Sequence, residues 1–388
     1  MLARLEVEIC RRFDAAAAVC VPMARTGLYL ALEQLIRPGQ TVVMSPLTIV
    51  DVVNAVILAG GIPLFADIQR RSCSMDPDQA ESLIDERTGA VLITHLHGET
   101  AGAHRFREIC DRRSVPLIED VAQAFGAVEG DRRLGTIGNV GVYSFGYYKN
   151  VNAWRGGMIV SQDSGLIAGV RQRLDQLSEL SGWRLLAISL HGLLTEVATW
   201  PPFFALFTHR LLRFAFLHDV RCVTRYLDPE VGARRLMAMP ARYLLRMTPR
   251  QAELAFDQLD CVDLDTATRI AHAGRYHEGL AGLAELITPD QHQGWSQIYT
   301  CYPIQFRRRE ALLRYATSAR RDFAAQHLRN CADLPEFREF HRDCPNARAA
   351  ARELILLPTY PGYPAEEIQR NIQVIREFLG TSTDRITG

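Results

Sequence analysis

Lysine is nearly absent from this chain. The 44 Lys and Arg residues comprise 43 arginines and a single lysine, Lys149. Arginine usually replaces lysine without loss on a surface, but its guanidinium stays protonated and cannot condense with an aldehyde, whereas an amine can lose its proton and do so. Lys149 is therefore either a leftover surface residue in an arginine-biased composition or a residue kept for its amine. Composition alone leaves both interpretations open.

Other absences narrow the class of protein. Lys+Arg and Asp+Glu both number 44, so no net charge favours binding to nucleic acid or to an anionic membrane. The nine cysteines are scattered and form no C-x-x-C pair, and the first residues, MLARLEVEICRRFD, are charged and amphipathic, unlike a signal peptide. We therefore expect reduced thiols and a cytoplasmic protein.

The first part of the chain alternates short apolar runs with helix-like spacing. Strands are expected at Thr41–Pro46, Ile62–Ile68, Ala90–Leu96, Val115–Asp120, Val140–Phe145 and Gly157–Ser161, with helices at Ile49–Leu58, Asp76–Ile84 and His104–Arg113. Continuous apolar strands that alternate with helices indicate an α/β fold whose mostly parallel sheet is covered by helices on both faces. Ligands of such sheets bind at the carboxyl ends of the strands.

Residues 165–240 differ from the rest because they are rich in Leu, Phe and Trp. The run LLAISLHGLLTEVATWPPFFALF is long enough for a membrane segment, but His191, Glu196 and the Pro201-Pro202 pair interrupt it. We favour a pair of buried or interface helices broken at the prolines. A monotopic contact with a membrane is the alternative, and we expect no membrane partner.

From Arg246 onward the pattern predicts an α+β domain. RMTPRQAELAFDQLDCVD is expected to form one long amphipathic helix, followed by a helix in TRIAHAGRYHEGLAGL, a strand at Ile298–Phe306, and helices at Glu310–His327 and Pro364–Leu379. The predicted organisation is a large domain over residues 1–240, with an apolar helical insertion at about 177–240, and a smaller α+β C-terminal domain over residues 241–388.

The surroundings of Lys149 match the needs of pyridoxal 5′-phosphate (PLP). This cofactor requires a lysine for its aldehyde, a carboxylate for its pyridine nitrogen, donors for its phosphate and a group beside its ring oxygen. Ser144 precedes Lys149 by five residues, and Asp120 ends a predicted strand with Gln123 following it.

The turn Ala24-Arg25-Thr26-Gly27 stands before the predicted helix LYLALEQL, where free N–H groups suit a phosphate. Taken singly, a strand-end Asp, a strand-end Ser and this turn are common features of proteins. Their order on one α/β pattern favours a PLP site.

Over nearly its whole length the sequence resembles the DegT/StrS family of fold-type I PLP enzymes, which are mostly sugar aminotransferases. The matching stretches include PLIEDVAQAFGA, GTIGNVGVYSFGYYKN, RMTPRQAELAFDQL and LPTYPGYPAEEIQRNI. The resemblance implies that Lys149 carries the cofactor and moves protons, and that Asp120 binds the pyridine nitrogen. It further implies roles for Gln123 at the ring, for Ser144 at the phosphate, and for Ala24, Arg25 and Thr26 in the phosphate turn.

Three departures from the family pattern bear on the substrate. Ile49 stands where the family often has an aromatic residue close to the cofactor, so we expect it at the cofactor without ring stacking. Leu244 stands where the cross-subunit loop usually has an Asn that contacts phosphate. Arg155 stands before the Gly-Gly pair where an acidic residue is common, and it is either a ligand of a substrate carboxylate or phosphate or a plain surface Arg.

Two further residues are candidates for contact with the substrate. His97 lies with His95 in THLHGE, at a spacing that could suggest a metal, but no carboxylate or cysteine cluster accompanies the pair. We predict no metal site and favour packing or lining of the active site. Arg246 lies near the loop that, by resemblance, reaches into the neighbouring subunit of a homodimer with shared active sites.

The predicted activity is transfer of an amino group from an amino-acid donor, glutamate or glutamine by resemblance, to a keto acceptor. A nucleotide-linked keto sugar is the leading acceptor, and a related natural-product intermediate is a second. Elimination or dehydration on the same fold is an alternative, although dehydratases of the family have His in place of the lysine. A non-catalytic PLP-fold partner protein is a third interpretation, which the presence of Lys149, Asp120 and Ser144 together disfavours.

Overall fold

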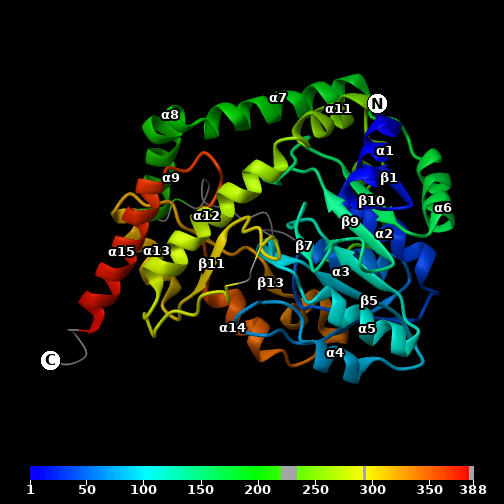
Figure 1. The fold of residues 1–388 in the computed structure, drawn as a ribbon, viewed down its shortest axis with the longest axis horizontal. Coiled ribbons are helices and arrows are strands. Elements are labelled where there is room, and N and C mark those ends of the chain that lie inside the picture. The colour runs from blue at the N-terminus through cyan, green and yellow to red at the C-terminus, as the bar shows by residue number, and fades with distance from the viewer. Residues whose placement is uncertain (219, 221–233, 292–293, 384–388) are drawn as a thin grey trace.

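A seven-stranded sheet forms the centre of the larger part of the molecule (Figure 1). The computed structural model describes residues 1–218, 220, 234–291 and 294–383. In spatial order the strands are β1 (Ala17–Val21), β10 (Gly157–Ser161), β9 (Val140–Ser144), β6 (Leu117–Asp120), β5 (Thr88–Thr94), β2 (Thr41–Met44) and β4 (Ile62–Phe65). All six strands predicted in the first part of the chain belong to this sheet, and β1 at its edge was not predicted.

The sheet is mostly parallel, as predicted. Strands β4, β2, β5, β6 and β9 pair in parallel, whereas β10 runs antiparallel to both β9 and β1. Every residue of β2, β6 and β10 is buried, which explains why these strands read as continuous apolar runs. The carboxyl ends of β5, β6 and β9 therefore meet at one edge of the sheet.

Helices cover both faces of the sheet. Beside one face lie α1 (Leu2–Phe13), α4 (Pro77–Leu83), α5 (Ala103–Arg113) and α11 (Pro249–Gln258). Beside the other lie α2 (Ala24–Leu35), α3 (Val50–Leu58), α6 (Ser164–Asp175) and α14 (Pro345–Glu353). Each face thus has its own buried cluster of side chains, and the two clusters with the sheet between them make a three-layer α/β/α structure.

A second, smaller unit contains a three-stranded sheet made of β11 (Tyr302–Gln305), β14 (Leu354–Leu357) and β12 (Ala324–Ala325). It packs with α12 (Val262–Leu280), α13 (Arg309–Ser318) and α15 (Ala365–Thr383) around a third buried cluster. The remaining short elements are β3 (Leu47–Thr48), which pairs with β13 (Arg329–Asn330), the hairpin β7 (Val128–Glu129) and β8 (Arg132–Arg133), and the 3₁₀ helices at Leu96–Gly98, Ala241–Tyr243, Cys331–Asp333 and Pro335–Phe340.

Two predicted helices in this half are wrong in their extent. The helix expected from Arg246 is split, because a capping box between Thr248 and Gln251 starts α11 at Pro249, which then ends at Gln258 before α12 begins. The helix expected to reach His327 ends at Ser318. Arg320 then has a left-handed φ of 61°, which an α-helix does not accommodate, and the chain continues into β12.

The three clusters do not follow the predicted boundary at residue 240. Met247, Ala252 and Val262 are buried in the cluster on one face of the large sheet. The segment from Leu328 to Leu354 contributes to the cluster on the opposite face. Residues from both sides of position 240 therefore build the core around the large sheet.

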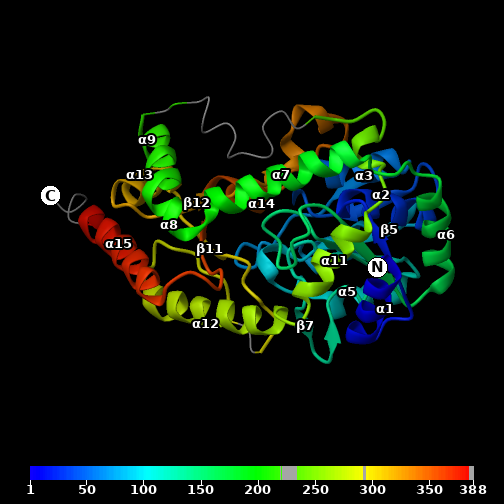
Figure 2. The same cartoon turned by 90° about the horizontal axis from the view of Figure 1, so that it is seen from above.

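The apolar segment at 177–240 forms helices on the outside of the molecule (Figures 1 and 2). These are α7 (Gly182–Thr199), α8 (Pro201–Phe203), a π-helical turn at Phe204–Thr208 and α9 (His209–Leu217), and positions 219 and 221–233 of the segment lie outside the described residues. The predicted break at the prolines is confirmed. Of the two predicted placements, buried or at an interface, burial within this chain is wrong, because large apolar side chains of α7 are exposed, Trp183 at 83%. The placement at an interface stays a prediction.

No helix in the described ranges combines the length and the apolar content that crossing a membrane would require.

Candidate active site

Asp120 is the last residue of β6 and lies at the carboxyl edge of the large sheet. Its side chain is only 5% exposed, and its Oδ1 accepts a hydrogen bond from the Ala122 N–H at 3.0 Å. Among the described residues, no hydrogen bond reaches its Oδ2. Burial raises the pKa of Asp120, while the Ala122 N–H and the nearby Lys149 and His95 oppose that rise. The site thus presents a buried carboxylate oxygen to an external donor.

Lys149 lies in the loop between β9 and β10, half-buried at the same edge. Burial lowers the pKa of its amine and Arg25 lowers it further, while the Asp120 carboxylate and Cys301 raise it. A lysine that gives up its proton more readily than an exposed one is better suited to condense with an aldehyde and to act as a base.

The lysine loop has a constrained backbone. Tyr148 and Trp154 have left-handed φ values of 60° and 61°. Such positions cost roughly 1–3 kcal/mol each and persist only where surrounding contacts enforce them. Those contacts include a backbone hydrogen bond from Ala153 to Phe145 at 2.9 Å and two bonds between Asn152 and the Gln258 side chain of α11 at 3.0 and 2.8 Å.

The first turn of α2 faces this loop and supplies free backbone donors. Its first hydrogen bond inside the helix is from Gly27 to Met23, so the N–H groups of Ala24, Arg25 and Thr26 have no partner within the helix. The predicted phosphate turn therefore has the backbone geometry that binds an anion.

The side chains of this turn are engaged elsewhere. Arg25 forms an ion pair with Asp51 of α3 and donates to the Tyr243 hydroxyl at 3.1 Å. The Thr26 hydroxyl donates to the Tyr243 carbonyl at 2.9 Å, and Thr26 is fully buried. The structure thus favours backbone rather than side-chain contacts from these two residues. Ile49, which caps α3 two residues before Asp51, is half-buried against the cluster that also contains α2.

Gln123 follows Asp120 by three residues and Ser144 precedes Lys149 by five, and each has a donor that no described residue accepts. The Ser144 Oγ accepts from the Gly146 N–H at 3.3 Å, which leaves its hydroxyl hydrogen unused. The Gln123 Oε1 accepts from the His97 N–H at 3.0 Å, which fixes the amide so that its NH₂ group points away from His97.

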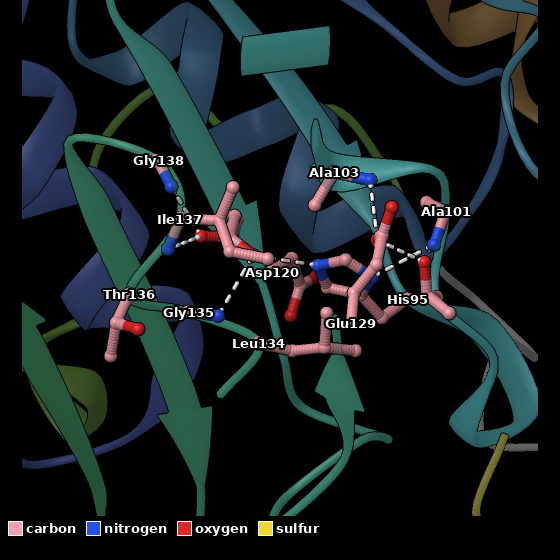
Figure 3. Close-up of polar contacts among 12 residues, drawn as sticks. His95, Ala101, Ala103, Asp120, Glu129, Leu134, Gly135, Thr136, Ile137 and Gly138 are labelled. Carbon is pink, nitrogen blue, oxygen red and sulfur yellow. Dashed lines mark hydrogen bonds and ion pairs between the residues drawn. The ribbon is translucent and has the colours of Figure 1, made fainter. Parts of the chain in front are cut away.

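A fully buried pair, His95 and Glu119, supports these strand ends from behind. His95 Nδ1 accepts from the Ala101 N–H at 3.0 Å, so the ring proton is on Nε2, which donates to Glu119 at 3.1 Å. The Glu119 carboxylate also accepts three backbone N–H groups, from Gly135, Ile137 and Gly138, at 2.6–2.9 Å (Figure 3). These contacts tie the ends of the strands to the loop at 135–138.

Glu129 organises the neighbouring loop in a similar way. Its carboxylate accepts from the Ala103 N–H at 2.8 Å at the start of α5, as Figure 3 shows, and from the Thr100 hydroxyl. The negative charge at a helix N-terminus stabilises that helix.

His97 is buried at 1% exposure, and its ring faces the C-terminal half of the chain. The Gln326 amide donates to its Nε2 at 2.7 Å, since Gln326 Oε1 already accepts two backbone N–H groups, so the ring proton is on Nδ1. No described residue accepts from that Nδ1. Burial lowers the pKa of His97 to about 4, so the ring is neutral near pH 7.

The two predicted substrate arginines differ in their surroundings. The half-buried Arg155 guanidinium makes no ion pair or hydrogen bond with the residues that the structure describes, and its charge acts on the Tyr147 hydroxyl. Arg246 instead pairs with Glu179 at 2.6 Å, and its backbone N–H donates to Ser178. The structure therefore does not bring Arg246 to the Lys149–Asp120 pair of the same chain.

Three residues near the site were not identified from the sequence. Cys301 interacts electrostatically with both Lys149 and Arg269, and burial raises the pKa of its thiol to about 12. The Arg269 Nε is buried without a partner among the described residues. Tyr243 holds both Arg25 and Thr26. No local motif signals Cys301 or Tyr243, because their contacts with Lys149, Arg25 and Thr26 span more than 100 positions of the chain.

These groups fit PLP. The carboxylate of a buried Asp120, whose Oδ2 receives no hydrogen bond from the described residues, a lysine of lowered pKa, the Gln123 amide NH₂ and N–H groups without a partner inside their own helix correspond to the four needs of the cofactor. The described residues contain no group of three or more His, Cys, Asp or Glu side chains arranged to hold a metal.

Comparison with known proteins agrees with this geometry. A model of the DegT/DnrJ/EryC1/StrS aminotransferase family matches residues 1–196 and 225–376, which leaves out part of the apolar segment. The spore coat polysaccharide biosynthesis protein SpsC of Bacillus subtilis is 25% identical over 97% of this chain and 89% of that protein. The GDP-perosamine synthase of Caulobacter vibrioides is 26% identical, over 93% and 85% of the two chains.

Among solved structures, an aminotransferase from Psychrobacter cryohalolentis has a TM-score of 0.77 at 19% identity, covering 98% of this chain and 91% of that one. This similarity confirms the predicted fold.

Proposed function

Because the chain belongs to the DegT/DnrJ/EryC1/StrS aminotransferase family and is a PLP-dependent enzyme, we propose that it transfers an amino group from glutamate or glutamine to the keto group of a nucleotide-linked sugar. The observation that supports this best is the electrostatic coupling of a half-buried Lys149 to the buried Asp120 at the carboxyl ends of the strands. Sugar chemistry is supported by the Caulobacter relative, whose name specifies a GDP-linked amino sugar.

Bound PLP supplies an aldehyde that condenses with amines and a pyridine ring that draws electrons from the carbon beside the amine nitrogen. Asp120 would hold a proton on the pyridine nitrogen. The backbone N–H groups of Ala24, Arg25 and Thr26, with the Ser144 hydroxyl, would bind the phosphate. Gln123 would donate from its amide NH₂ beside the ring oxygen. Ile49, the residue before α3, would border the cofactor, and its side chain has no ring to stack.

Lys149 moves the protons of the reaction. With PLP bound, its Nζ would remove the proton from the donor α-carbon in the first half of the reaction. In the second half the same amine would deliver a proton to the carbon that receives the amino group. Lowering of the lysine pKa by burial increases the fraction of neutral amine available for these steps. Donor nitrogen is thereby transferred, and the donor leaves as its keto acid.

Three residues are proposed to face the substrates. The unpaired Arg155 guanidinium binds a carboxylate of the donor or a phosphate of the acceptor, since a free half-buried cation favours an anionic ligand. His97 offers its unpartnered Nδ1–H as a donor. Arg246 acts from a neighbouring subunit, because within its own chain it pairs with Glu179. We accordingly propose a homodimer with shared active sites, located in the cytoplasm.

A two-step assay tests this function. Purified enzyme incubated with glutamate should lose the visible absorbance of its lysine-bound cofactor and release 2-oxoglutarate. Addition of GDP- or TDP-linked keto sugars should then restore the absorbance and yield an amino sugar detectable by mass spectrometry. Elimination of water from the sugar without transfer of nitrogen would support the alternative chemistry, and a coloured protein that ignores every donor would support a non-catalytic role.

A further inference from the structure

Helix α7 carries a stripe of exposed apolar side chains with a regular spacing. Its members are Trp183, Leu186, Leu190, Leu193 and Val197, together with Trp200, the residue that caps the C-terminal end of the helix, and they are 47–83% exposed. They follow one another at steps of three, four, three, four and three residues. This is the 3.5-residue period with which one helix packs along another in a coiled coil.

The opposite side of α7 already faces the body of the protein. Gly192 lies against the Trp154 ring so closely that a Cβ there would come within 2.6 Å of it. Glu196 accepts a hydrogen bond from Trp154 Nε1 at 3.1 Å. At roughly 100° per residue, the members of the stripe lie about 80–180° around the helix axis from Gly192. Their exposure shows that the side chains point outward, and both views show α7 on the outside of the molecule (Figures 1 and 2).

The order of residues in the stripe is symmetric about its centre. Counted inward, each end reads Trp, then an aliphatic residue, then Leu. A two-fold axis between positions 191 and 192 would set Trp183 against the partner's Trp200, Leu186 against the partner's Val197, and Leu190 against the partner's Leu193. Antiparallel coiled coils have this kind of layer, in which the two core positions of the heptad face each other.

We propose that α7 pairs in antiparallel orientation with α7 of a second copy of this chain. The contact is isologous, since the same surface of each copy meets itself. Given the exposures above and the size of these side chains, the stripe offers on the order of 700 Å² per copy, against roughly 800 Å² per partner in a stable interface of standard size. Leu194 and the exposed residues beyond Trp200 extend the apolar surface further.

The charges on α7 favour a protein partner over a lipid surface. An interfacial helix has a wide apolar face and a polar face rich in Lys and Arg. Besides His191, the charged residues of α7 are one Arg and one Glu, Arg184 and Glu196, and both lie beside the stripe rather than on it. The stripe itself carries no charged side chain, as the apolar core of a helix–helix seam requires.

The pairing would also steady the active-site loop. The Tyr147 hydroxyl donates to the Ile188 carbonyl of α7 at 3.4 Å, and Trp154 packs on Gly192, so α7 touches the loop on both sides of Lys149. This contact is separate from the shared-site contact around Arg246 proposed above and does not depend on the reaction.

Cysteine cross-linking tests the orientation. In a Cys261→Ser background, which removes an exposed native thiol, Trp183→Cys combined with Trp200→Cys should give mostly covalent dimers under mild oxidation. Each single variant should give almost none, because like positions would be about 25 Å apart in the antiparallel pair. The Cys261→Ser protein alone is the control. Efficient cross-linking by the single variants, or none by the double variant, would overturn the proposal.

The mass in solution provides a second test. Leu190→Arg with Leu193→Arg should halve the mass of the assembly measured by light scattering, whereas Arg184→Glu, beside the stripe, should leave it unchanged. Circular dichroism verifies that each variant is folded. An unchanged mass in a folded double variant contradicts the pairing. A third outcome would assign the stripe to a lipid surface instead. In that case the parent protein binds vesicles of anionic phospholipid, the Leu190→Arg/Leu193→Arg variant does not, and the Trp183→Cys/Trp200→Cys variant forms no cross-linked dimer.

Discussion

The Glu119 carboxylate receives a hydrogen bond from His95 Nε2 at 3.1 Å, and both side chains are fully buried. Glu119 precedes Asp120, and because neighbouring strand residues point to opposite faces, it lies behind the site that Asp120 faces. The carboxylate replaces the water it has lost by accepting four N–H groups from His95 and the loop at 135–138. A charge buried in this way is costly to disturb.

Glu119→Gln should therefore destabilise the protein. A neutral amide weakens four charge-assisted hydrogen bonds and places an NH₂ group against backbone N–H donors, which we expect to lower the free energy of unfolding by about 2–4 kcal/mol. Urea denaturation followed by circular dichroism measures the change. Glu108→Gln on the exposed face of α5 is the matched control, with an expected change within roughly 0.5 kcal/mol. Equal stability of the two variants would contradict a structural role for Glu119.

Lys149→Ala should remove the visible absorbance of bound PLP and lower the rate of amino transfer by at least ~10³-fold, because both the condensing amine and the general base are lost. Lys149→Arg is an informative control. It keeps the positive charge but cannot condense with an aldehyde, so it should also lack the band. A variant without the lysine that kept the band would refute the assignment of Lys149.

Asp120→Asn should slow amino transfer by about 10²-fold or more, because the amide cannot hold the pyridine proton by charge. The same substitution should raise the free energy of unfolding of the cofactor-free protein at pH 7, although it lowers the activity. The folded pKa of Asp120 is raised, so the folded state holds its proton more tightly and its stability falls as pH rises through that window. Without cofactor, Asp120→Asn should then be more stable than the parent at pH 7. Asp257→Asn, an exposed position, serves as control, and equal unfolding midpoints for parent and Asp120→Asn would count against a buried charge.

The sequence predicts those features of the structure that are determined by residues close to one another in the chain. The sheet strands, Lys149, Asp120 and the α2 turn carry local signals in burial pattern, residue type and order. Contacts across the fold carry none, so the attachment of Thr26 to Tyr243 and the nearness of Cys301 to Lys149 emerge only from the structure.

Two of the predictions that were wrong, the single helix from Arg246 and the burial of α7 within the chain, also followed from local patterns alone. The helix expected from Arg246 has continuous amphipathic spacing, and a local cap at Thr248 and the turn after Gln258 override it. The apolar residues of α7 predict a buried or interface helix, but no described residue of the same chain covers its exposed apolar face. A pattern therefore identifies a surface that needs covering without stating what covers it.

His97 should make the protein sensitive to acid. The pKa of His97 in the folded protein is about 4, below the ordinary value of 6.5. Between pH 6.5 and pH 4, His97 is therefore protonated in the unfolded state but neutral in the folded state. The resulting stability is present above pH 6.5 and is lost as pH falls toward 4, amounting to about 2 kcal/mol between pH 7 and pH 5. His97→Gln should flatten this part of the unfolding profile, whereas His218→Gln, at an exposed position, should not. An unaltered slope in His97→Gln would mean that the ring titrates normally.

Substitution of Arg155 should weaken substrate binding more than it slows the chemical step. Its guanidinium is half-buried and unpaired with the described residues, so Arg155→Ala should remove a charge-assisted bond to an anionic group of the donor or acceptor. A bond of this kind contributes roughly 1.5–3 kcal/mol, which corresponds to about 10–100-fold in KM for the substrate concerned, with a smaller change in kcat. Measuring KM for glutamate and for the keto sugar separately identifies which of them it binds. Arg155→Lys should restore part of the affinity, and Arg184→Ala on the surface of α7 should change neither constant. If KM for both substrates stays within twofold in Arg155→Ala, the residue is a surface arginine after all.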